Sequence, residues 1–421
     1  MNLRVLLMSL MRRGNLDKLY QRNLRHQYAG NEEIIKREMR ENAMNIFKFH
    51  VQHNPEYRRF LTDKHFDFKD LDHIVWEDIP IITKDDLKKY YPEVKSEVYN
   101  YSASGGSTNV PFKYPASKES ALNIWPAHWL MYEMCGGHPY DNMLMLMAYG
   151  NAKKTLTKKV YHGLSNFHTF NAFTMTEEQM YEMCDCIHKK HLRFIYGYSS
   201  AINQFLRFLK DKNIKLQLKG IFTTSDNRIM SSYSLAREYC NCEVYNQYGA
   251  HDGDVFTFEC KEHNGLHILH DMCTMEIVNH NIIVTAVKNR AFPFIRYKVG
   301  DIAEGEELIT EKCKCGRTLF RLKGISGRNT YFIQDSDGNE VSVMLFTYPF
   351  DDDPKVLQYQ VLEEDGRLYV NIITDDYTVE DLNRLFMPFI KKRVKREVQF
   401  VINQPLLKNK NGKTLLFYKK S

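Results

Sequence analysis

The segment from about residue 180 to residue 250 constrains the fold most, because short apolar runs and amphipathic stretches alternate along it. HLRFIYGY and LKGIFTTS predict buried strands, and SSAINQFLRFLKDKN between them has its apolar side chains at helical spacing. RIMSSYSLAREYC predicts a second helix and CEVYNQYG a third strand, while NMLMLMAYG upstream predicts one more. Strands joined by crossover helices form a parallel sheet, so we predict an α/β protein.

The pattern of polar and apolar residues changes after about residue 265. HILHDMCTMEIVNHNIIVTAVKN alternates polar and apolar residues and contains turn signals, which predicts an antiparallel or barrel-like subdomain. Farther along, VLQYQVLEEDGRLYVNIIT predicts a hairpin, VEDLNRLFMPFIKKRV a helix interrupted by Pro388, and EVQFVIN a final strand before a basic tail. The Gly-, Ser- and Asn-rich stretch between these regions marks a boundary. We therefore predict a large domain of residues 1–328 and a small α+β domain of residues 329–421.

Charge is distributed unevenly along the 421 residues, whose net charge is +6. Residues 1–50 hold ten Lys/Arg and five Asp/Glu, and residues 391–421 hold ten and one, so the two ends carry +5 and +9 and the middle carries 6 − 5 − 9 = −8. Stacking aromatics do not interleave with the basic tail, which argues against nucleic-acid binding. A solvated basic face and a polyphosphate site both fit.

Apolar segments and cysteine content indicate the cellular compartment of the protein. No stretch has the ~20 apolar residues of a transmembrane helix, and the N-terminal MNLRVLLMSLMRRG lacks the features of a signal peptide. That stretch predicts an amphipathic helix packed on the body, with a weak surface anchor as the alternative. Nine cysteines, an odd number, indicate a reducing compartment, and we expect a cytoplasmic protein.

A Gly/Ser/Thr-rich stretch, SASGGSTNVPFKY, stands at residues 102–114. It is either a linker or a loop that holds phosphate through backbone N–H groups and hydroxyls, although it lacks the G-x-x-x-x-G-K-[ST] spacing. Ligands of parallel sheets gather at the carboxyl ends of the strands, and here those ends read IYGYSS, TTSDN and NQYGAHDGD. Three such ends in order, following this loop, favour the phosphate-binding interpretation.

Together these segments resemble the acyl-adenylate-forming enzymes. SGGSTNVP resembles their phosphate-binding loop, VYNQYGAHDGD their aromatic-glycine motif, FPFIRYKVGDIA their Arg-Tyr-Gly-Asp segment, ISGRN their hinge, and NGKTLLFYK the segment of their catalytic lysine. HNPEYRRF and IPIITKDDLKKY resemble the phenylacetate-CoA ligase branch, in particular its CapK-like members associated with capsular polysaccharide loci. The resemblance covers nearly the whole chain. It implies a large N-terminal domain and a mobile C-terminal domain.

The resemblance also implies roles for individual residues. ATP would be held by the loop, by the aromatic-glycine motif and by the Arg/Asp segments, that is by Ser104, Gly105, Gly106, Ser107, Thr108, Tyr248, Gly249, Arg296, Asp301 and Arg328. Tyr248 would stack on adenine, Asp301 would accept the ribose hydroxyls, and Asp252 would bind Mg²⁺. Lys413 would bridge the substrate carboxylate and the α-phosphate. The chain departs from the family at four places. Asn109 replaces a glycine, Asp252 replaces a glutamate, and His251 replaces a Thr/Ser and is expected near the α-phosphate. At the hinge, NTY follows Gly-Arg where the family commonly has an acidic residue.

A second metal site is predicted from cysteine and histidine spacing. EKCKCGR places two thiols, Cys313 and Cys315, on a short knuckle before glycine, and FECKEHNGLHI supplies Cys260 and His267. These four side chains suit a tetrahedral Cys₃His zinc site. The alternatives that stay open are unbonded thiols, or a different ligand drawn from His263, His270 and Cys273.

Three alternative functions are compatible with these predictions. The first is an AMP-forming acid–CoA ligase that uses ATP, Mg²⁺ and coenzyme A. The second transfers the acyl group to an amine or hydroxyl acceptor, such as a sugar in polysaccharide biosynthesis. The third is a non-catalytic nucleotide-binding protein. In each case the partners are small molecules, and a monomer or homodimer is expected.

Overall fold

The computed structural model describes residues 3–91, 100–103, 113–139, 141–147, 160, 163–172, 175–225, 229–328, 332–334, 336, 340–343, 347, 349–350, 353, 355–392, 394–408 and 414–420. Within this part the chain forms two compact units. The first comprises Met1–Asp141 and Tyr245–Ile325, and the second Asn142–Val244 and Ser326–Ser421. The chain passes between units at residues 325 and 326, three residues before the expected boundary at 328/329. The division into residues 1–328 and 329–421 stays a prediction.

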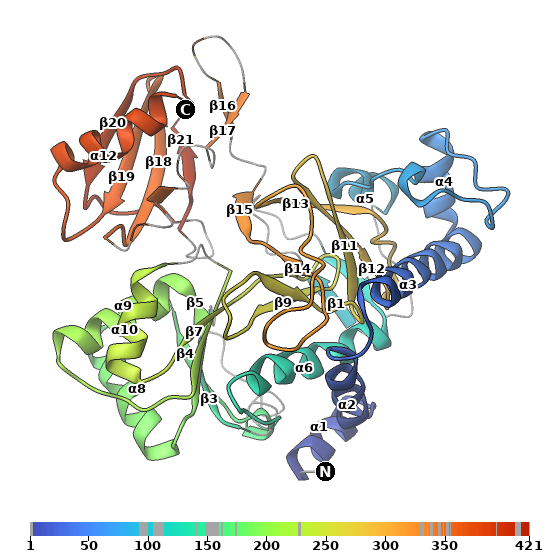
Figure 1. The fold of residues 1–421 in the computed structure, drawn as a ribbon, viewed down its shortest axis with the longest axis horizontal. Coiled ribbons are helices and arrows are strands. Elements are labelled where there is room, and N and C mark those ends of the chain that lie inside the picture. The colour runs from blue at the N-terminus through green and yellow to red at the C-terminus, as the bar shows by residue number, and fades with distance from the viewer. Residues whose placement is uncertain are drawn as a thin grey trace. The chain divides into compact units, whose positions relative to one another are not determined.

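The first unit begins with helices whose starts are set by short polar caps. Asn15, Asn31 and Asn54 each accept a hydrogen bond from the backbone N–H three residues on, and Thr83 forms a capping box with Asp86. The helices are α1 (Leu3–Met11), α2 (Leu16–His26), α3 (Glu32–His53), α4 (Pro55–Asp63), α5 (Lys84–Tyr90) and α6 (Lys118–Glu133), as labelled in Figure 1, together with the short 3₁₀ helix η1 (Trp76–Asp78).

The strands of the first unit form small antiparallel sheets. One sheet has the order β14-β10-β9-β8, and another contains β11-β12-β13, while β1 pairs with β2. This confirms the antiparallel subdomain predicted after residue 265. The bounds are β1 (Asn100–Ala103), β2 (Lys113–Ala116), β8 (Gly249–Ala250), β9 (Val255–Glu259), β10 (Leu266–Ile268), β11 (Cys273–Val278), β12 (Asn281–Ala286), β13 (Tyr297–Ala303) and β14 (Arg321–Leu322). Strand β15 (Ile325–Arg328) begins at the last residue of the first unit.

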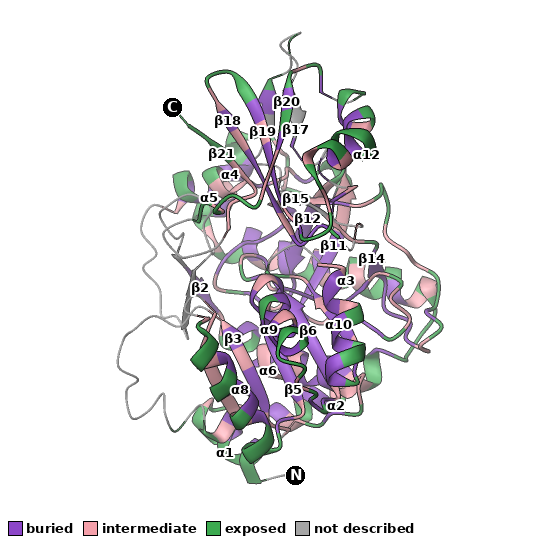
Figure 2. Cartoon of the chain, turned by 90° about the vertical axis from the view of Figure 1, so that its left-hand side faces the viewer, coloured by how far each residue is buried: buried purple, intermediate pink, exposed green. Residues whose placement is uncertain are grey.

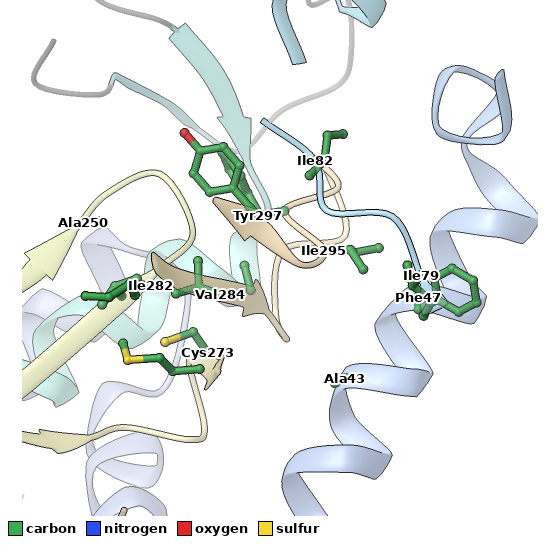
Figure 3. Close-up of a cluster of buried hydrophobic side chains, with 14 of the residues drawn as sticks. Ala43, Phe47, Ile79, Ile82, Ala250, Cys273, Ile282, Val284, Ile295 and Tyr297 are labelled. Carbon is green, nitrogen blue, oxygen red and sulfur yellow. The ribbon is translucent and has the colours of Figure 1, made fainter. Parts of the chain in front are cut away.

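One apolar cluster holds this unit together. It joins Phe47 of α3 and Ile79 near η1 to Ile282 and Val284 of β12 and Tyr297 of β13, part of which is drawn in Figure 3. These side chains are all at most 1% exposed. At about 25 cal/mol per Å² of buried apolar surface, such a cluster dominates the stability of the unit. It fixes β13, the strand that carries the candidate site.

The second unit contains the predicted parallel sheet. Its order is β4-β3-β5-β6-β7, and the β3–β4, β3–β5 and β5–β6 pairs are all parallel. Apolar side chains of β3, β5 and β6 pack against α8, α9 and α10 in one cluster. The elements are β3 (Met143–Met147), β4 (Phe167–Asn171), α8 (Glu177–Lys190), β5 (Phe194–Tyr198), α9 (Ser199–Asp211), β6 (Gly220–Thr224) and α10 (Ser231–Cys240). Strand β7 (Val244–Gln247) begins at Val244, the last residue of this segment of the unit.

The C-terminal part of the second unit is the predicted small α+β fold. The expected hairpin turns at Asp365 and Gly366, and α12 contains Pro388 as the sequence indicated. The elements are β16 (Phe332–Gln334), β17 (Glu340–Ser342), β18 (Gln358–Glu364), β19 (Arg367–Ile373), α12 (Val379–Lys391), β20 (Val398–Ile402) and β21 (Phe417–Lys419). The expectation that β20 is the last strand was wrong, because β21 pairs in parallel with β18.

The burial pattern follows the sequence pattern. Strands β5 and β6 are almost wholly buried, as expected for continuous apolar runs, and they appear purple in Figure 2. None of the described helices is both long and apolar enough to cross a membrane.

Candidate functional site

Strand β13 carries two of the site side chains. Tyr297 begins the strand, and Asp301 follows four residues later. Between them the pairing with β12 shifts register, and Gly300 adopts φ 91°, a conformation that favours glycine. The irregularity increases the local twist of the strand and redirects the side chains that follow it. The backbone thereby presents Asp301 to the segment that carries the aromatic-glycine motif.

Two tyrosine–aspartate hydrogen bonds join β13 to that motif. The Tyr248 hydroxyl donates to Asp301 Oδ2 at 2.8 Å, and the Tyr297 hydroxyl donates to Asp252 Oδ2 at 3.0 Å. Asp301 is buried, Tyr248 and Asp252 are half-buried, and Tyr297 is fully buried. Burial, and secondarily the charge of Asp252, raises the pKa of Tyr297, so its hydroxyl stays a donor. Both carboxylates are therefore held in fixed positions.

Two histidines lie at or near the aromatic-glycine motif. His251 is exposed at the turn after β8. His128 of α6 is buried, its Nδ1–H donates to the Ile124 carbonyl at 2.9 Å, and its ring centroid lies 4.8 Å from that of Phe256. Burial lowers the pKa of His128 to about 4, with a smaller contribution from His251, so His128 is neutral at pH 7. The sequence pointed to His251 but not to His128, because a lone histidine on an amphipathic helix carries no signal.

Arg296 has a structural position. It is 5% exposed, and its guanidinium makes a bidentate ion pair with Glu276, with Nε–Oε1 at 3.0 Å and Nη2–Oε2 at 3.1 Å. It also donates to the carbonyls of Glu77 and, at 2.7 Å, of Ile79. These bonds tie the η1 segment to the sheet. The expected nucleotide contact of Arg296 stays a prediction that these bonds do not support.

Several expected site residues fall outside the described part of the chain. These are the loop residues Ser104, Gly105, Gly106, Ser107 and Thr108, together with Asn109 and Lys413. Arg328 is described only as the backbone end of β15. Gly249 is described and exposed, within β8 beside Tyr248. The structure thus brings together Tyr248, Asp252 and Asp301, and their roles stay predictions.

A cavity of about 490 Å³ lies within the second unit. Its lining includes Tyr198 and Ser200, which belong to the strand-end segment IYGYSS, and Arg207 of α9. Lys408 and Thr414 line it from the C-terminal segment. Arg207 also forms an ion pair with Asp375, which links α9 to the C-terminal fold. The residue beside Thr414 in the sequence is Lys413.

The four predicted zinc ligands converge within the first unit. The ligand atoms of Cys260, His267, Cys313 and Cys315 all lie within 4.8 Å of one another, and no other such group of three or more is found among the described residues. Cys260 and Cys313 have their Sγ atoms 3.7 Å apart, and Cys315 Sγ lies 3.6 Å from His267 Nε2. A tetrahedral zinc with 2.3 Å bonds to sulfur and ~2.0 Å bonds to nitrogen separates its ligands by about 3.8 and about 3.5 Å. The spacing fits zinc.

The secondary structure explains why these four side chains meet. Cys260 follows β9, His267 lies in β10 directly opposite Phe258 of β9, and the Cys313–Cys315 knuckle is closed by a hydrogen bond from the Gly316 N–H to the Cys313 carbonyl. Hydrogen bonds that the Cys315 sulfur accepts from Cys260 and from His267 lower the pKa of the Cys315 thiol, which favours the thiolate that metals bind.

The competing ligands are placed elsewhere. His270 accepts a hydrogen bond from the Phe320 N–H at 3.2 Å, and His263 stacks on Tyr245 with ring centroids 5.6 Å apart. Cys273 is fully buried in the apolar cluster. Among the candidates that the sequence left open, His267 and Cys260 are the ones that the structure groups with the knuckle.

Besides His128, the sequence did not identify Tyr297 as a residue of the candidate nucleotide site. Tyr297 lies in the RYKVGD segment, yet nothing in the sequence distinguished it from a core tyrosine. Its partner Asp252 is 45 residues away in the chain. The pairing depends on the register of β13 and therefore has no local sequence signal.

Comparisons with known proteins identify the fold. No family model matches the chain. A curated relative, "Protein CapK" of Staphylococcus aureus, is 24% identical over 278 residues, which covers 62% of this chain and 60% of that protein. The match thus spans about three fifths of the curated relative, and it gives the predicted CapK-like branch weak support.

Solved structures match over more of the chain. A crystal structure of 2-hydroxyisobutyryl-CoA ligase in the postadenylation state, in complex with R3-HIB-AMP, has a TM-score of 0.71 at 14% identity and covers 94% of this chain and 91% of that one. O-succinylbenzoate coenzyme A synthetase from Bacillus subtilis, in complex with AMP, has a TM-score of 0.50 at 13% identity, with 86% and 79% covered. The chain therefore has the fold of the AMP-forming acyl-CoA ligases, as the resemblance implied.

Proposed function

We propose that this chain is an ATP-dependent, AMP-forming ligase that activates a carboxylic acid as an acyl-adenylate and passes the acyl group to coenzyme A. In the first step a carboxylate oxygen attacks the α-phosphorus of ATP and pyrophosphate leaves. In the second step a thiol attacks the acyl carbon and AMP leaves. Catalysis of this kind depends on positioning and charge neutralisation.

The observation that carries the proposal is the bond between Tyr248 and Asp301. An aromatic ring and a carboxylate fixed by a 2.8 Å hydrogen bond form a pair that suits a nucleoside: the ring stacks on the base, and the carboxylate accepts the ribose hydroxyls. The residues of this pair are 53 positions apart, and each falls in a separate motif. The AMP and acyl-AMP complexes named among the matched structures support the same ligand class.

Asp252 is the proposed magnesium ligand. Its carboxylate is held by the Tyr297 hydroxyl at 3.0 Å, which leaves its other oxygen for a metal. Mg²⁺ at nucleotide sites is commonly bound through one or two carboxylates, with the phosphates and water completing an octahedron. A single carboxylate at this place therefore suffices. Lys413 supplies the positive charge between the two reacting anions in this proposal.

A second candidate is transfer to an amine or hydroxyl, such as that of a sugar. The match to Protein CapK favours this candidate, because the CapK-like members that the sequence resembles are associated with capsular polysaccharide loci. The first step is the same in both candidates. Only the acceptor differs.

The decisive experiment separates the two steps. The protein is mixed with ATP, Mg²⁺ and a panel of carboxylic acids, pyrophosphate release is measured, and the acyl-adenylate is trapped with hydroxylamine. A second panel then adds coenzyme A, amino sugars or neutral sugars in place of hydroxylamine. Thioester formation supports the ligase, and ester or amide formation supports the alternative. ATP binding without pyrophosphate release across the panel refutes both and leaves a non-catalytic nucleotide-binding protein.

The Cys₃His cluster holds a structural zinc ion in this proposal. Arg317, next to the knuckle, donates to Gln27 at 2.7 Å and to Glu133 at 2.7 Å, so the knuckle is also linked to the end of α2 and to α6. A metal that fixes residues 313–315 thereby stabilises the packing of the N-terminal helices on the antiparallel sheets. All four ligands come from the protein, which is typical of structural rather than catalytic zinc.

A further inference from the structure

Helix α1 exposes an unusual amount of apolar surface. Among the described residues, twelve large hydrophobic side chains are exposed, and five of them lie on this nine-residue helix: Leu3, Leu6, Leu7, Leu10 and Met11. Leu3 is 67% exposed and Leu10 is 65% exposed, the two highest values of the twelve. The helix appears green near the N-terminus in Figure 2. Single exposed leucines are ordinary, but a cluster marks an interaction surface.

The exposed side chains form one continuous stripe. Leu3, Leu6, Leu7 and Leu10 are spaced i, i+3, i+4 and i+7, so they share one face of the helix. Val5 and Met8 point to the opposite side and are 3% and 2% exposed. The helix is therefore apolar on two sides, and only one of them is covered by the protein.

The covered side is firmly attached. The Ser9 hydroxyl accepts a hydrogen bond from the Leu16 N–H at 3.2 Å, and the Arg12 guanidinium donates to the Ala121 carbonyl of α6 at 3.2 Å. The same guanidinium lies 5.8 Å from the centre of the Trp125 ring. These contacts hold α1 against α2 and α6. The leucine stripe consequently faces outward as part of the folded unit and is not a frayed end.

The segment that carries the stripe is positively charged. Residues 1–31 contain six Lys/Arg and one Asp, which gives a net charge of +5. Arg4 and Arg13, at the two ends of α1, and Lys18 and Arg25 of α2 are all exposed. An apolar helical face flanked by basic side chains is the pattern of helices that lie in the interface of an anionic membrane.

We propose that α1 docks the protein on an anionic lipid surface, with the leucine stripe inserted among the acyl chains and the basic side chains against the headgroups. A second copy of the chain is a poorer occupant for two reasons. Nine residues make a helix only about 13 Å long, far too short to provide the ~800 Å² per partner of a stable dimer. Two segments of like charge would also repel each other.

The test is sedimentation of the full-length protein with vesicles. Vesicles of phosphatidylcholine alone are compared with vesicles containing 30 mol% phosphatidylglycerol, as a chosen composition. We expect binding to the anionic vesicles, weaker binding at 0.5 M salt, and at least about tenfold weaker binding to neutral vesicles. Equal binding to both compositions, or none to either, overturns the proposal.

Matched variants localise the effect. Leu3→Glu combined with Leu10→Glu changes the two most exposed leucines and is expected to weaken binding about 30-fold or more. Arg4→Gln with Arg13→Gln is expected to weaken it about 25-fold, on the anionic vesicles only. Leu385→Glu with Leu407→Glu is the control, since these leucines are 48% and 42% exposed on the C-terminal fold. Equal loss in the control pair contradicts the assignment to α1.

Two further measurements test whether misfolding or dimerisation explains the vesicle results. Circular dichroism and the thermal midpoint of the α1 variants establish that they fold, which is expected because the changed side chains already face solvent. Light scattering coupled to gel filtration establishes the oligomeric state. If the wild-type protein is a dimer that Leu3→Glu with Leu10→Glu converts to a monomer, while neither protein binds vesicles, the stripe is a dimer contact and the lipid proposal is wrong.

Discussion

Replacing Asp301 with alanine tests the nucleoside site most informatively. Asp301 is 6% exposed and accepts the Tyr248 hydroxyl at 2.8 Å, so its carboxylate has one defined orientation. In our account the same carboxylate accepts the hydroxyls of the ribose. Removing the carboxylate and removing a ribose hydroxyl should therefore eliminate the same interaction.

The size of the effect follows from hydrogen bonds to a charged group. Such a bond contributes about 1.5–3 kcal/mol, which corresponds to roughly a 10- to 150-fold change in affinity. We expect the wild-type protein to bind 2′-deoxy-ATP about 10-fold or more weakly than ATP. We expect Asp301→Ala to bind ATP and 2′-deoxy-ATP about equally, because the group that distinguishes them is gone.

The assay is calorimetric titration of wild type and variant with both nucleotides, which gives a double-mutant cycle. The 3′-deoxy nucleotide provides a second, independent cycle. Asp72→Ala serves as the control, since Asp72 is exposed and pairs with Lys48 at 2.6 Å. A coupling energy near zero, with both changes weakening binding additively, would refute the assigned role of Asp301 even if the variant binds ATP poorly.

Three further predictions concern the scaffold. Purified protein should contain about one zinc per chain by mass spectrometry. Cys315→Ser should lose the zinc and have a lower thermal midpoint. Metal-free wild-type protein of undiminished stability would contradict the Cys₃His site. Burial lowers the pKa of His50 to about 4, so the stability that its neutral form contributes is present above pH 6.5 and is lost as the pH falls toward 4. Between pH 7.5 and pH 5 this loss of stability is about 2 kcal/mol. His50→Gln keeps a donor for the Asn289 carbonyl, which His50 contacts at 3.0 Å, and should lose correspondingly less stability over the same pH range in denaturant titrations. An equal loss in the variant would contradict the assignment. Gly197→Ala should destabilise the parallel sheet by about 1–3 kcal/mol, because its Cβ would lie 2.4 Å from the Leu146 carbonyl oxygen; an unchanged denaturation midpoint would show that the strands can separate without cost.

The parallel sheet was the most predictable feature of the molecule. Strands β3, β5 and β6 are buried on both faces, so they read as apolar runs, and the helices between them have one apolar face. Strand β4 was missed because it is an edge strand whose residues are all half-buried, and its alternation is therefore weak. Strand β21 was missed because it is three residues long and depends on pairing with β18.

The zinc cluster was predictable only in part. The knuckle Cys313–Cys315 has a local signature, since a C-x-C pair followed by glycine closes a tight turn. The choice between His267 and its neighbours His263 and His270 depends on the register of β10 against β9, in which His267 stands opposite Phe258. A one-residue shift would have turned His267 to the other face. Register of this kind is determined by tertiary packing.

The role of Arg296 shows the limit of motif reasoning. The segment around it matched a nucleotide-binding motif, yet its guanidinium is occupied by Glu276, 20 residues earlier, and by backbone carbonyls of the η1 segment. A buried arginine of this kind needs a partner for each donor. No pattern in the sequence identifies that partner, because Glu276 lies in β11 and Arg296 directly before β13, and only the folded sheet brings them together.

The most direct test of the central claim is the acyl-hydroxamate assay performed with Lys413→Ala. With an accepted acid, wild type should form hydroxamate in an ATP- and Mg²⁺-dependent reaction. The variant should form it at least about 100-fold more slowly while binding ATP with nearly unchanged affinity, and Lys419→Ala should behave as wild type. Undiminished hydroxamate formation by Lys413→Ala would contradict the account.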